Sequence, residues 1–204
     1  MNQDLVDEID DLIDLLTKSG FFSTEEIIEI LEDQFIDYDI DFSDYSIPLN
    51  DFNNKNFSSL EKAFIKLADK SIIAVHNCGY DFKEGVDDIY ELYVHLINNK
   101  YSCEGFCFYS FEDVEEAIEE NILKLTFGDF ERNEDKSLEI GELVYQQLID
   151  AGFEVEWDKS VNSPVEIINF TWDKKYCEDK DYEIEGAYDL FTGVINEKGF
   201  FKVN

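Results

Sequence analysis

The chain has 204 residues and carries 49 Asp and Glu against 16 Lys and Arg, which gives a formal net charge of −33 at pH 7. So large a negative charge repels nucleic acid and anionic membranes and attracts basic partners. Because 44% of the residues are apolar and 15% aromatic, the chain is expected to fold around a core, unlike a disordered acidic tail. The composition therefore favours a folded protein that binds a basic protein, and it argues against direct binding of nucleic acid.

The first 20 residues contain no basic region followed by an apolar core, so we expect no secretory signal or transit peptide. No apolar stretch approaches the ~20 residues needed to span a bilayer, and we expect no membrane partner. The four cysteines are expected to be reduced thiols in such a chain. These features predict a cytoplasmic location.

Two helices are predicted at the start of the chain. Apolar residues at spacings of three and four predict an amphipathic helix over 3–19 that ends at Gly20. Ser23 and Glu26 form a capping box that opens a second helix through about Phe35, so the two helices are expected to form a hairpin. A long loop is predicted over 37–56, and a further capping box, Ser58 with Glu61, predicts the start of the next helix.

Strands and helices alternate from residue 71 onward. The predicted strands are 71–76, 105–109, 122–127, 153–157 and 165–170, the last two forming an antiparallel hairpin. The predicted helices lie around 86–97 and over 111–120 and 136–151. The tail closes with a second hairpin candidate whose turn is N-E-K-G, residues 196–199.

This pattern predicts an α/β (or α+β) fold with a mixed sheet of about five strands and packed helices, preceded by an acidic helical hairpin. We expect three parts, namely an acidic helical segment over 1–56, an α/β core over 57–175 and a C-terminal hairpin tail over 176–204. Residues 1–56 hold 16 acidic and two basic residues, so acid density is highest there.

Five segments of the core resemble one bacterial domain family of unknown function. They are H-N-C-G-Y-D (76–81), G-F-C-F-Y-S (105–110), L-T-F-G-D-F (125–130), L-I-D-A-G (148–152) and V-E-W-D with I-I-N-F-T-W (155–172). In that family the first segment more often reads N-A-G-Y-T, and the second usually ends in His where this chain has Ser110. The resemblance covers about half the chain, implies an α/β core and assigns no catalytic residue.

Acidic residues form a stripe on the first predicted helix, because residues three and four apart are neighbours on a helix. Asp4, Asp7, Asp11 and Asp14 make this stripe, with Glu8 beside it. Their carboxylates are spaced about 5 Å along the axis, not far from the rise of about 3.4 Å per nucleotide of a nucleic-acid strand. A basic groove could read the stripe as a phosphate backbone, whereas the simpler interpretation is a solvated acidic face.

Metal sites are not predicted. D-Y-D-I-D at 37–41 resembles half a calcium loop, but Phe42 stands where Gly is needed and Pro48 where a bidentate Glu belongs. One group of residues has side chains of the kind that bind zinc: His76, Cys78, Cys103 and Cys107. Their spacing along the chain is not that of a standard zinc site. We expect no metal and no cofactor, and we interpret the cysteines as buried, inert thiols.

The leading hypothesis is that the chain is an acidic interaction protein, acting as an inhibitor, immunity factor or anti-defence factor. It would bind a basic protein such as a nuclease, toxin or defence effector, with nucleic-acid mimicry as one form of binding. The expected partner-binding residues are Asp4, Asp7, Glu8, Asp11, Asp14, Glu25, Glu29, Asp37, Asp39 and Asp41. The alternative is a small enzyme or ligand-binding domain with a pocket at the carboxyl ends of the strands. That pocket would contain His76, Cys78, Tyr80, Asp81 and Asp129.

Overall fold

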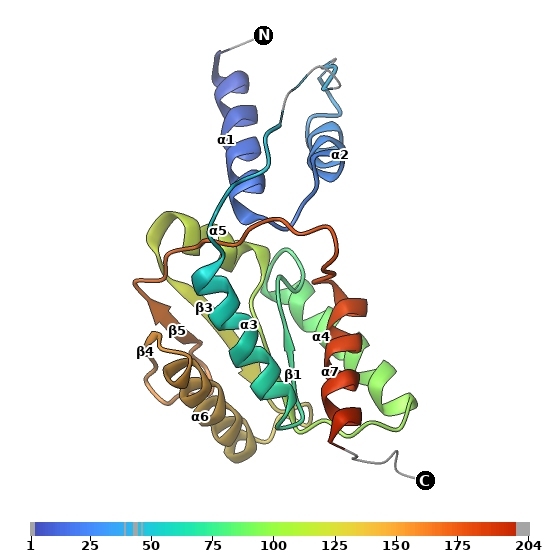
Figure 1. Cartoon of the computed structure of the whole chain (residues 1–204), viewed down its shortest axis with the longest axis vertical. Helices are drawn as coiled ribbons and strands as arrows, with labels where there is room; N and C mark the ends of the chain where they lie inside the picture. The colour runs from blue at the N-terminus through green and yellow to red at the C-terminus, as the bar shows by residue number, and fades with distance from the viewer. Residues whose placement is uncertain (1–2, 39, 43–44, 46, 199–204) are drawn as a thin grey trace.

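The computed structural model describes residues 3–38, 40–42, 45 and 47–198, and these residues form seven helices and a mixed five-stranded sheet, with α1 and α2 beyond one end of the sheet (Figure 1). The fold is α+β, and the predicted fold class is confirmed. The helices are α1 (Gln3–Ser19), α2 (Thr24–Gln34), α3 (Lys55–Ala68), α4 (Phe82–Asn98), α5 (Phe111–Glu120), α6 (Glu134–Asp150) and α7 (Ile184–Glu197). The strands are β1 (Ile72–Val75), β2 (Gly105–Phe108), β3 (Leu123–Gly128), β4 (Glu154–Glu156) and β5 (Val165–Ile168).

The sheet has the order β1-β2-β3-β5-β4. Strands β1 and β2 are parallel and are joined through α4, whereas the other neighbouring pairs are antiparallel. The predicted antiparallel hairpin of β4 and β5 is confirmed. Because β3 runs opposite to β1 and β2, the residues that follow β3 lie at the other end of the sheet from those that follow β1.

Both faces of β1 are buried, which explains its continuous apolar sequence. Ile72 and Ala74 face a core shared with α3 and α6, while Ile73 and Val75 face a second core shared with α4 and α7. The first core continues into α1, α2 and α5, and α1 joins the rest of the protein by packing against α5.

Helix α3 begins at Lys55 and not at the predicted Ser58, because its cap comes from a distant part of the chain. The Asp173 carboxylate accepts hydrogen bonds from the backbone N–H groups of Lys55, Asn56 and Phe57, each at 2.9 Å. These are three of the N–H groups that a helix leaves unpaired at its start. Ser58 instead accepts a hydrogen bond from the Asn54 side chain at 2.9 Å. The capping box predicted at Ser58 is therefore wrong, whereas the one at Ser23 is confirmed.

The hairpin predicted for the tail is also wrong, because residues 184–197 form helix α7. Ala187, Phe191 and Ile195 recur at a spacing of four and are buried against β1 and α4. Packing against β1 and α4 favours a helix in this segment, although its short apolar runs suggested strands. The N-E-K end of the expected turn terminates this helix, and residues 199–204 lie outside the described part of the chain.

Residues between α2 and α3 form a loop, as predicted, in the part of it that the structure describes. Phe42 is 1% exposed and packs against Phe35 and Tyr45. The sixth position of the suggested calcium loop is thus a core side chain. Asp37 and Asp41 are exposed, and Asp39 lies outside the described residues.

Candidate functional site

Residues 172–174, here called the clamp segment, hold the helical hairpin on the rest of the protein. The indole N–H of Trp172 donates to the Ser19 carbonyl at 3.1 Å, and the Lys174 amine donates to the Gly20 carbonyl. Asn50 donates to the Thr17 carbonyl at 2.7 Å. Because the last carbonyls of a helix have no partner within it, these three donors satisfy the C-terminus of α1. Asp173 caps α3 from the same segment, so the clamp segment joins the end of α1 to the start of α3.

Gly20 is required at this junction. Its φ is +69°, in the left-handed region, and a Cβ atom there would collide with the Lys174 backbone carbonyl. A larger residue would therefore push the hairpin away from the clamp segment. The predicted stop of the first helix at Gly20 is confirmed, and the structure adds that close approach of a second backbone also demands glycine.

Lys174 is 1% exposed and lies among aromatic rings. Its amine is 4.3 Å from the ring centre of Phe21 and 4.2 Å from that of Tyr182. Burial lowers the pKa of Lys174 to about 7, against the opposing effect of Glu61. No sequence signal pointed to this residue, because a lysine between Asp173 and Lys175 reads as part of a charged surface segment.

Helices α1, α2 and α5 carry a concentration of negative charge, which we call the acidic end; α1 and α2 lie at the top of Figure 1, and α5 lies below α1. They contain six, five and six acidic residues, and Lys18 is their single basic residue. These 38 residues thus hold 17 of the 49 acids of the chain. Helix α1 packs against both α2 and α5, so the three acidic helices adjoin one another.

The acidic stripe predicted on the first helix lies on the outer side of α1. Asp4, Asp7, Asp11 and Asp14 are all exposed, while Ile9 and Leu16 are buried toward the core. Asp14 pairs with Lys18 at 2.5 Å, and Asp7 accepts a hydrogen bond from Gln3 at 2.8 Å. Glu25 and Glu29 on α2 are exposed as well. The hairpin therefore presents its carboxylates on a surface that the clamp segment fixes in place.

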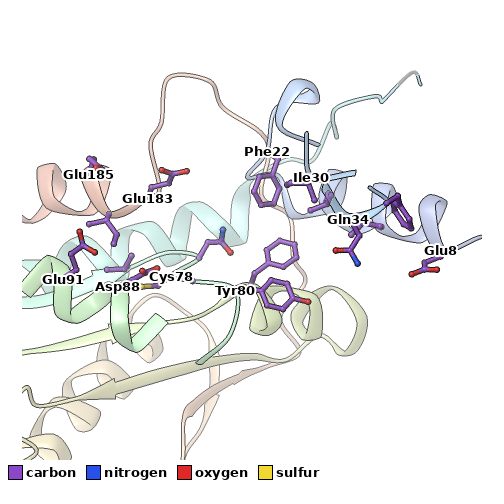
Figure 2. Close-up of a pocket in the computed structure, with 18 residues that line it drawn as sticks. Glu8, Phe22, Ile30, Gln34, Cys78, Tyr80, Asp88, Glu91, Glu183 and Glu185 are labelled. Carbon is purple, nitrogen blue, oxygen red and sulfur yellow. The ribbon is translucent and has the colours of Figure 1, made fainter. Parts of the chain in front are cut away.

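A cavity of about 730 Å³ lies between the inner side of the hairpin and the core. Leu12 and Leu16 of α1 and Ile30 of α2 line one wall, and the turn after β1 lines the other. Figure 2 shows that Asp88, Glu91, Glu183 and Glu185 gather toward one end of it, while Phe22, Ile30 and Gln34 lie toward the other end with Glu8 beyond them. We call this space the hairpin groove.

Every charged side chain that lines the hairpin groove is acidic. They are Glu8, Asp88, Glu91, Glu183 and Glu185. Burial raises the pKa of Asp88, and the nearby carboxylates of Glu84 and Glu91 add to the increase. Burial and the neighbouring Asp181 and Glu185 likewise raise the pKa of Glu183. The groove therefore holds carboxylates whose negative charge is poorly compensated.

Sequence reasoning found Glu8 among these acids but missed the other four. Asp88 and Glu91 read as ordinary polar positions of a helix, and Glu183 and Glu185 fall in the tail that was expected to be a hairpin. No sequence signal brings α4, α7 and the N-terminal hairpin to one cavity, because their proximity arises only from the packing of the helices around β1.

The structure does not gather the residues of the alternative pocket into one site. Cys78 and Tyr80 line the hairpin groove, while Asp81 caps α4 by accepting from the Glu84 N–H at 2.8 Å. His76 lines a different cavity of about 670 Å³, beside Glu61, Lys180 and Tyr182. Asp129 follows β3 and so lies at the opposite end of the sheet, because β3 is antiparallel to β2.

His76 has the environment of a packed core histidine. Its Nδ1 is 2.8 Å from the Tyr109 hydroxyl, and its ring stacks on Phe64 with centres 4.2 Å apart. Burial lowers the pKa of His76 to about 3, and the positive charges of Lys174 and Lys180 contribute. The imidazole is therefore neutral at physiological pH, and it joins β1 to β2 through Tyr109.

The buried cysteines carry protonated thiols. Burial raises the pKa of Cys78 to about 12, and burial also raises the pKa of Cys107. Because the thiolate is the nucleophilic form, these environments disfavour a catalytic cysteine. All four cysteines are free, and no group of three or more His, Cys, Asp or Glu is arranged to hold a metal ion in the described residues.

Asp129 organises the turn between β3 and α6. Its carboxylate accepts the N–H groups of Glu131 and Asn133 at 3.1 and 3.0 Å, and lies 3.3 Å from the Lys136 amine. Its own N–H donates to the Ser137 hydroxyl at 3.1 Å. These contacts account for a buried carboxylate at this position without a catalytic role.

Comparison with known proteins adds one finding. The model of one family, described as "Domain of unknown function (DUF6891)", matches residues 53–176. The match includes the sheet and the clamp segment and excludes helices α1, α2 and α7. Neither the curated proteins nor the solved structures contain a match to this chain. In the described part of the chain, none of the helices has the length and apolar character needed to cross a bilayer.

Proposed function

The chain belongs to the DUF6891 family, and we propose that it is an acidic interaction protein that binds a basic surface of another protein. The observation that carries the proposal is the acidic end, where 17 acidic side chains and one lysine lie on three adjoining helices. A partner rich in Lys and Arg would be attracted over distances of about a Debye length, ~8 Å at physiological ionic strength.

The fixed position of the acidic end supports binding over simple solubilisation. The clamp segment satisfies the carbonyls at the end of α1, and Ile9, Leu16, Ile27 and Leu31 are buried beneath the hairpin. The carboxylates of α1 therefore belong to a helix that is already folded and packed, and binding would not require this helix to fold first. Bidentate hydrogen bonds from partner arginines to these carboxylates would supply specific contacts.

We propose further that the basic surface is one that binds nucleic acid, as in a nuclease, toxin or defence effector. The exposed stripe Asp4, Asp7, Asp11 and Asp14 presents charges about 5 Å apart along α1. That regular spacing resembles a row of phosphates more closely than a scattered acidic surface does. Competition with nucleic acid distinguishes this form of binding from attraction to any basic protein.

The proposal is tested by affinity capture from the source cell at two ionic strengths. The wild-type chain should retain a basic protein at low ionic strength and lose it at high ionic strength. A variant with Asp4, Asp7, Asp11 and Asp14 changed to Lys should not retain it. Added duplex DNA should displace the captured protein if its nucleic-acid-binding surface is the one occupied.

The matched control reverses four exposed acids that lie away from the acidic end, namely Glu131, Glu139, Asp189 and Glu197. Both variants change the net charge equally, so a difference between them reports the position of the charges. Equal losses in both variants, or capture that ignores ionic strength, would contradict the proposal. Capture that persists with excess DNA would contradict the proposed nucleic-acid mimicry but not the binding of a basic protein.

A further inference from the structure

The hairpin groove combines apolar walls with an acidic rim. Leu12, Leu16 and Ile30 contribute apolar surface from the hairpin, and Phe111 contributes it from the core. The charged residues of the rim are all carboxylates, as described above. An anionic ligand would be repelled, and an apolar ligand would leave the carboxylates without compensation. The lining therefore selects an occupant that is both cationic and apolar.

Four of the five lining carboxylates lie at one end of the groove, and Glu8 lies at the other. Figure 2 shows Asp88 and Glu91 on α4 and Glu183 and Glu185 at the start of α7 toward one end, whereas Phe22 and Ile30 lie toward the other end. A cationic group and an apolar group would therefore occupy different parts of the groove. A chain that bears both kinds of side chain meets this requirement.

The groove also contains an unused hydrogen-bond acceptor. Asn77, in the turn after β1, lines the groove, and its side-chain oxygen is buried and has no hydrogen-bond partner among the described residues. A buried acceptor without a partner costs about 1–3 kcal/mol. A donor from an occupant, such as a backbone N–H or an ammonium group, would remove that cost.

We propose that the hairpin groove receives a segment of the basic partner in which a Lys or Arg side chain neighbours a large apolar side chain. The basic side chain lies against Asp88, Glu91 and the two groove carboxylates at the start of α7, and the apolar side chain lies against Leu12 and Ile30. This inference rests on the proposed function, because it identifies which part of the partner enters which part of this chain. A second copy of the chain is a poor occupant, because each copy carries a net charge of −33.

The acidic end and the groove then have different roles in binding. The exposed stripe on α1 attracts the partner and affects mainly the association rate, as exposed charges do. The groove buries a short part of the partner and affects mainly the dissociation rate, since partly buried charge pairs and apolar contacts are less screened by salt. The two surfaces meet at α1, whose outer side carries the stripe and whose inner side lines the groove.

The test uses two short synthetic peptides with the same number of lysines, one of Lys and Leu and the other of Lys and Ser. Binding to the whole chain is measured by fluorescence anisotropy at low ionic strength and at about 1 M salt, where the Debye length is about 3 Å. The Lys/Leu peptide should retain binding at high salt, and the Lys/Ser peptide should lose it.

Variants of the groove identify the site. Asp88→Asn with Glu91→Gln should weaken binding of the Lys/Leu peptide about tenfold. The control, Glu131→Gln with Glu139→Gln, removes the same charge outside both the groove and the acidic end and should change binding little. Ile30→Ser should reduce the preference for the Lys/Leu peptide, whereas Ile149→Ser on the exposed side of α6 should leave it unchanged. Circular dichroism checks that each variant is folded.

The outcomes separate this inference from the proposed function. If the groove variants bind as their controls do, while reversal of the α1 stripe still abolishes capture of a basic protein, the groove proposal is wrong and the proposed function stands. If neither peptide binds any form of the chain even at low ionic strength, the proposed function fails as well. A Lys/Ser peptide that binds as well as the Lys/Leu peptide at high salt would also overturn the groove proposal.

Discussion

Replacement of Lys174 by Met should change how the stability of the protein depends on pH. Lys174 is buried, its amine donates to the Gly20 carbonyl, and burial lowers its pKa to about 7. Methionine has a similar length and no titratable group. The exposed neighbour Lys175 pairs with Asp51 at 2.8 Å, and Lys175→Met is the matched control.

The expected magnitude follows from the two pKa values of Lys174. In the unfolded chain the amine titrates near its ordinary pKa of 10.5, and in the folded chain near 7. Between these values the unfolded chain binds a proton that the folded chain does not, so the free energy of unfolding rises with pH. This contribution is lost as the pH falls from 10.5 toward 7. At about 1.4 kcal/mol per pH unit, the increase from about pH 7 to about pH 9 is roughly 2 kcal/mol.

Urea denaturation followed by circular dichroism at several pH values measures this difference. Loss of the hydrogen bond to Gly20 adds a destabilisation of about 1–3 kcal/mol to Lys174→Met that does not depend on pH, so the slope of the pH profile, and not the absolute stability, reports the titration of Lys174. Wild type and Lys175→Met should show the steeper rise with pH, and Lys174→Met should lack it. Parallel pH profiles for wild type and Lys174→Met would refute a buried, neutral amine in the folded state.

Three further predictions concern the core. Asp173→Ala removes the acceptor of three backbone N–H groups and should lower the free energy of unfolding, measured by urea titration, by about 2 kcal/mol. The control Asp179→Ala, in an exposed loop, should have little effect. Equal losses of stability in both variants would contradict the role of Asp173 as the cap of α3. Since the pKa of His76 is lowered to about 3, its ring nitrogens should show the neutral imidazole by ¹⁵N NMR at about pH 5, and titration of His76 between about pH 5 and 7 would be inconsistent with its burial. The Cys107 thiol should react with a thiol reagent only after denaturation, and rapid labelling of the native protein would show that it is accessible.

Local signals predicted the elements whose information lies within one segment. The spacing of apolar residues predicted α1 over its full length, and the capping box at Ser23 fixed the start of α2. The same signal failed at Ser58, because the N-terminus of α3 is capped by Asp173 from another part of the chain. A local cap is decisive only when no distant group competes for the same N–H donors.

The candidate site shows the same division. The exposed carboxylates of α1 were predicted, because the residues on one side of a helix follow from its period. The groove acids Asp88, Glu91, Glu183 and Glu185 were not, since they come from two helices that meet only after folding. His76 and Asp129 were grouped on the assumption that both follow strands running in the same direction. The antiparallel course of β3 separates them.

By itself, the sequence determined the amount and sign of the charge, the helical hairpin that carries the densest part of it and the succession of strands and helices, because each depends on composition or on neighbours along the chain. The tertiary structure decided the direction of β3, the helical form of residues 184–197, the burial of Lys174 and the position of the hairpin groove. These features depend on which surfaces are buried against each other in the folded chain, because burial against another helix or strand outweighs a weak local preference for helix or strand.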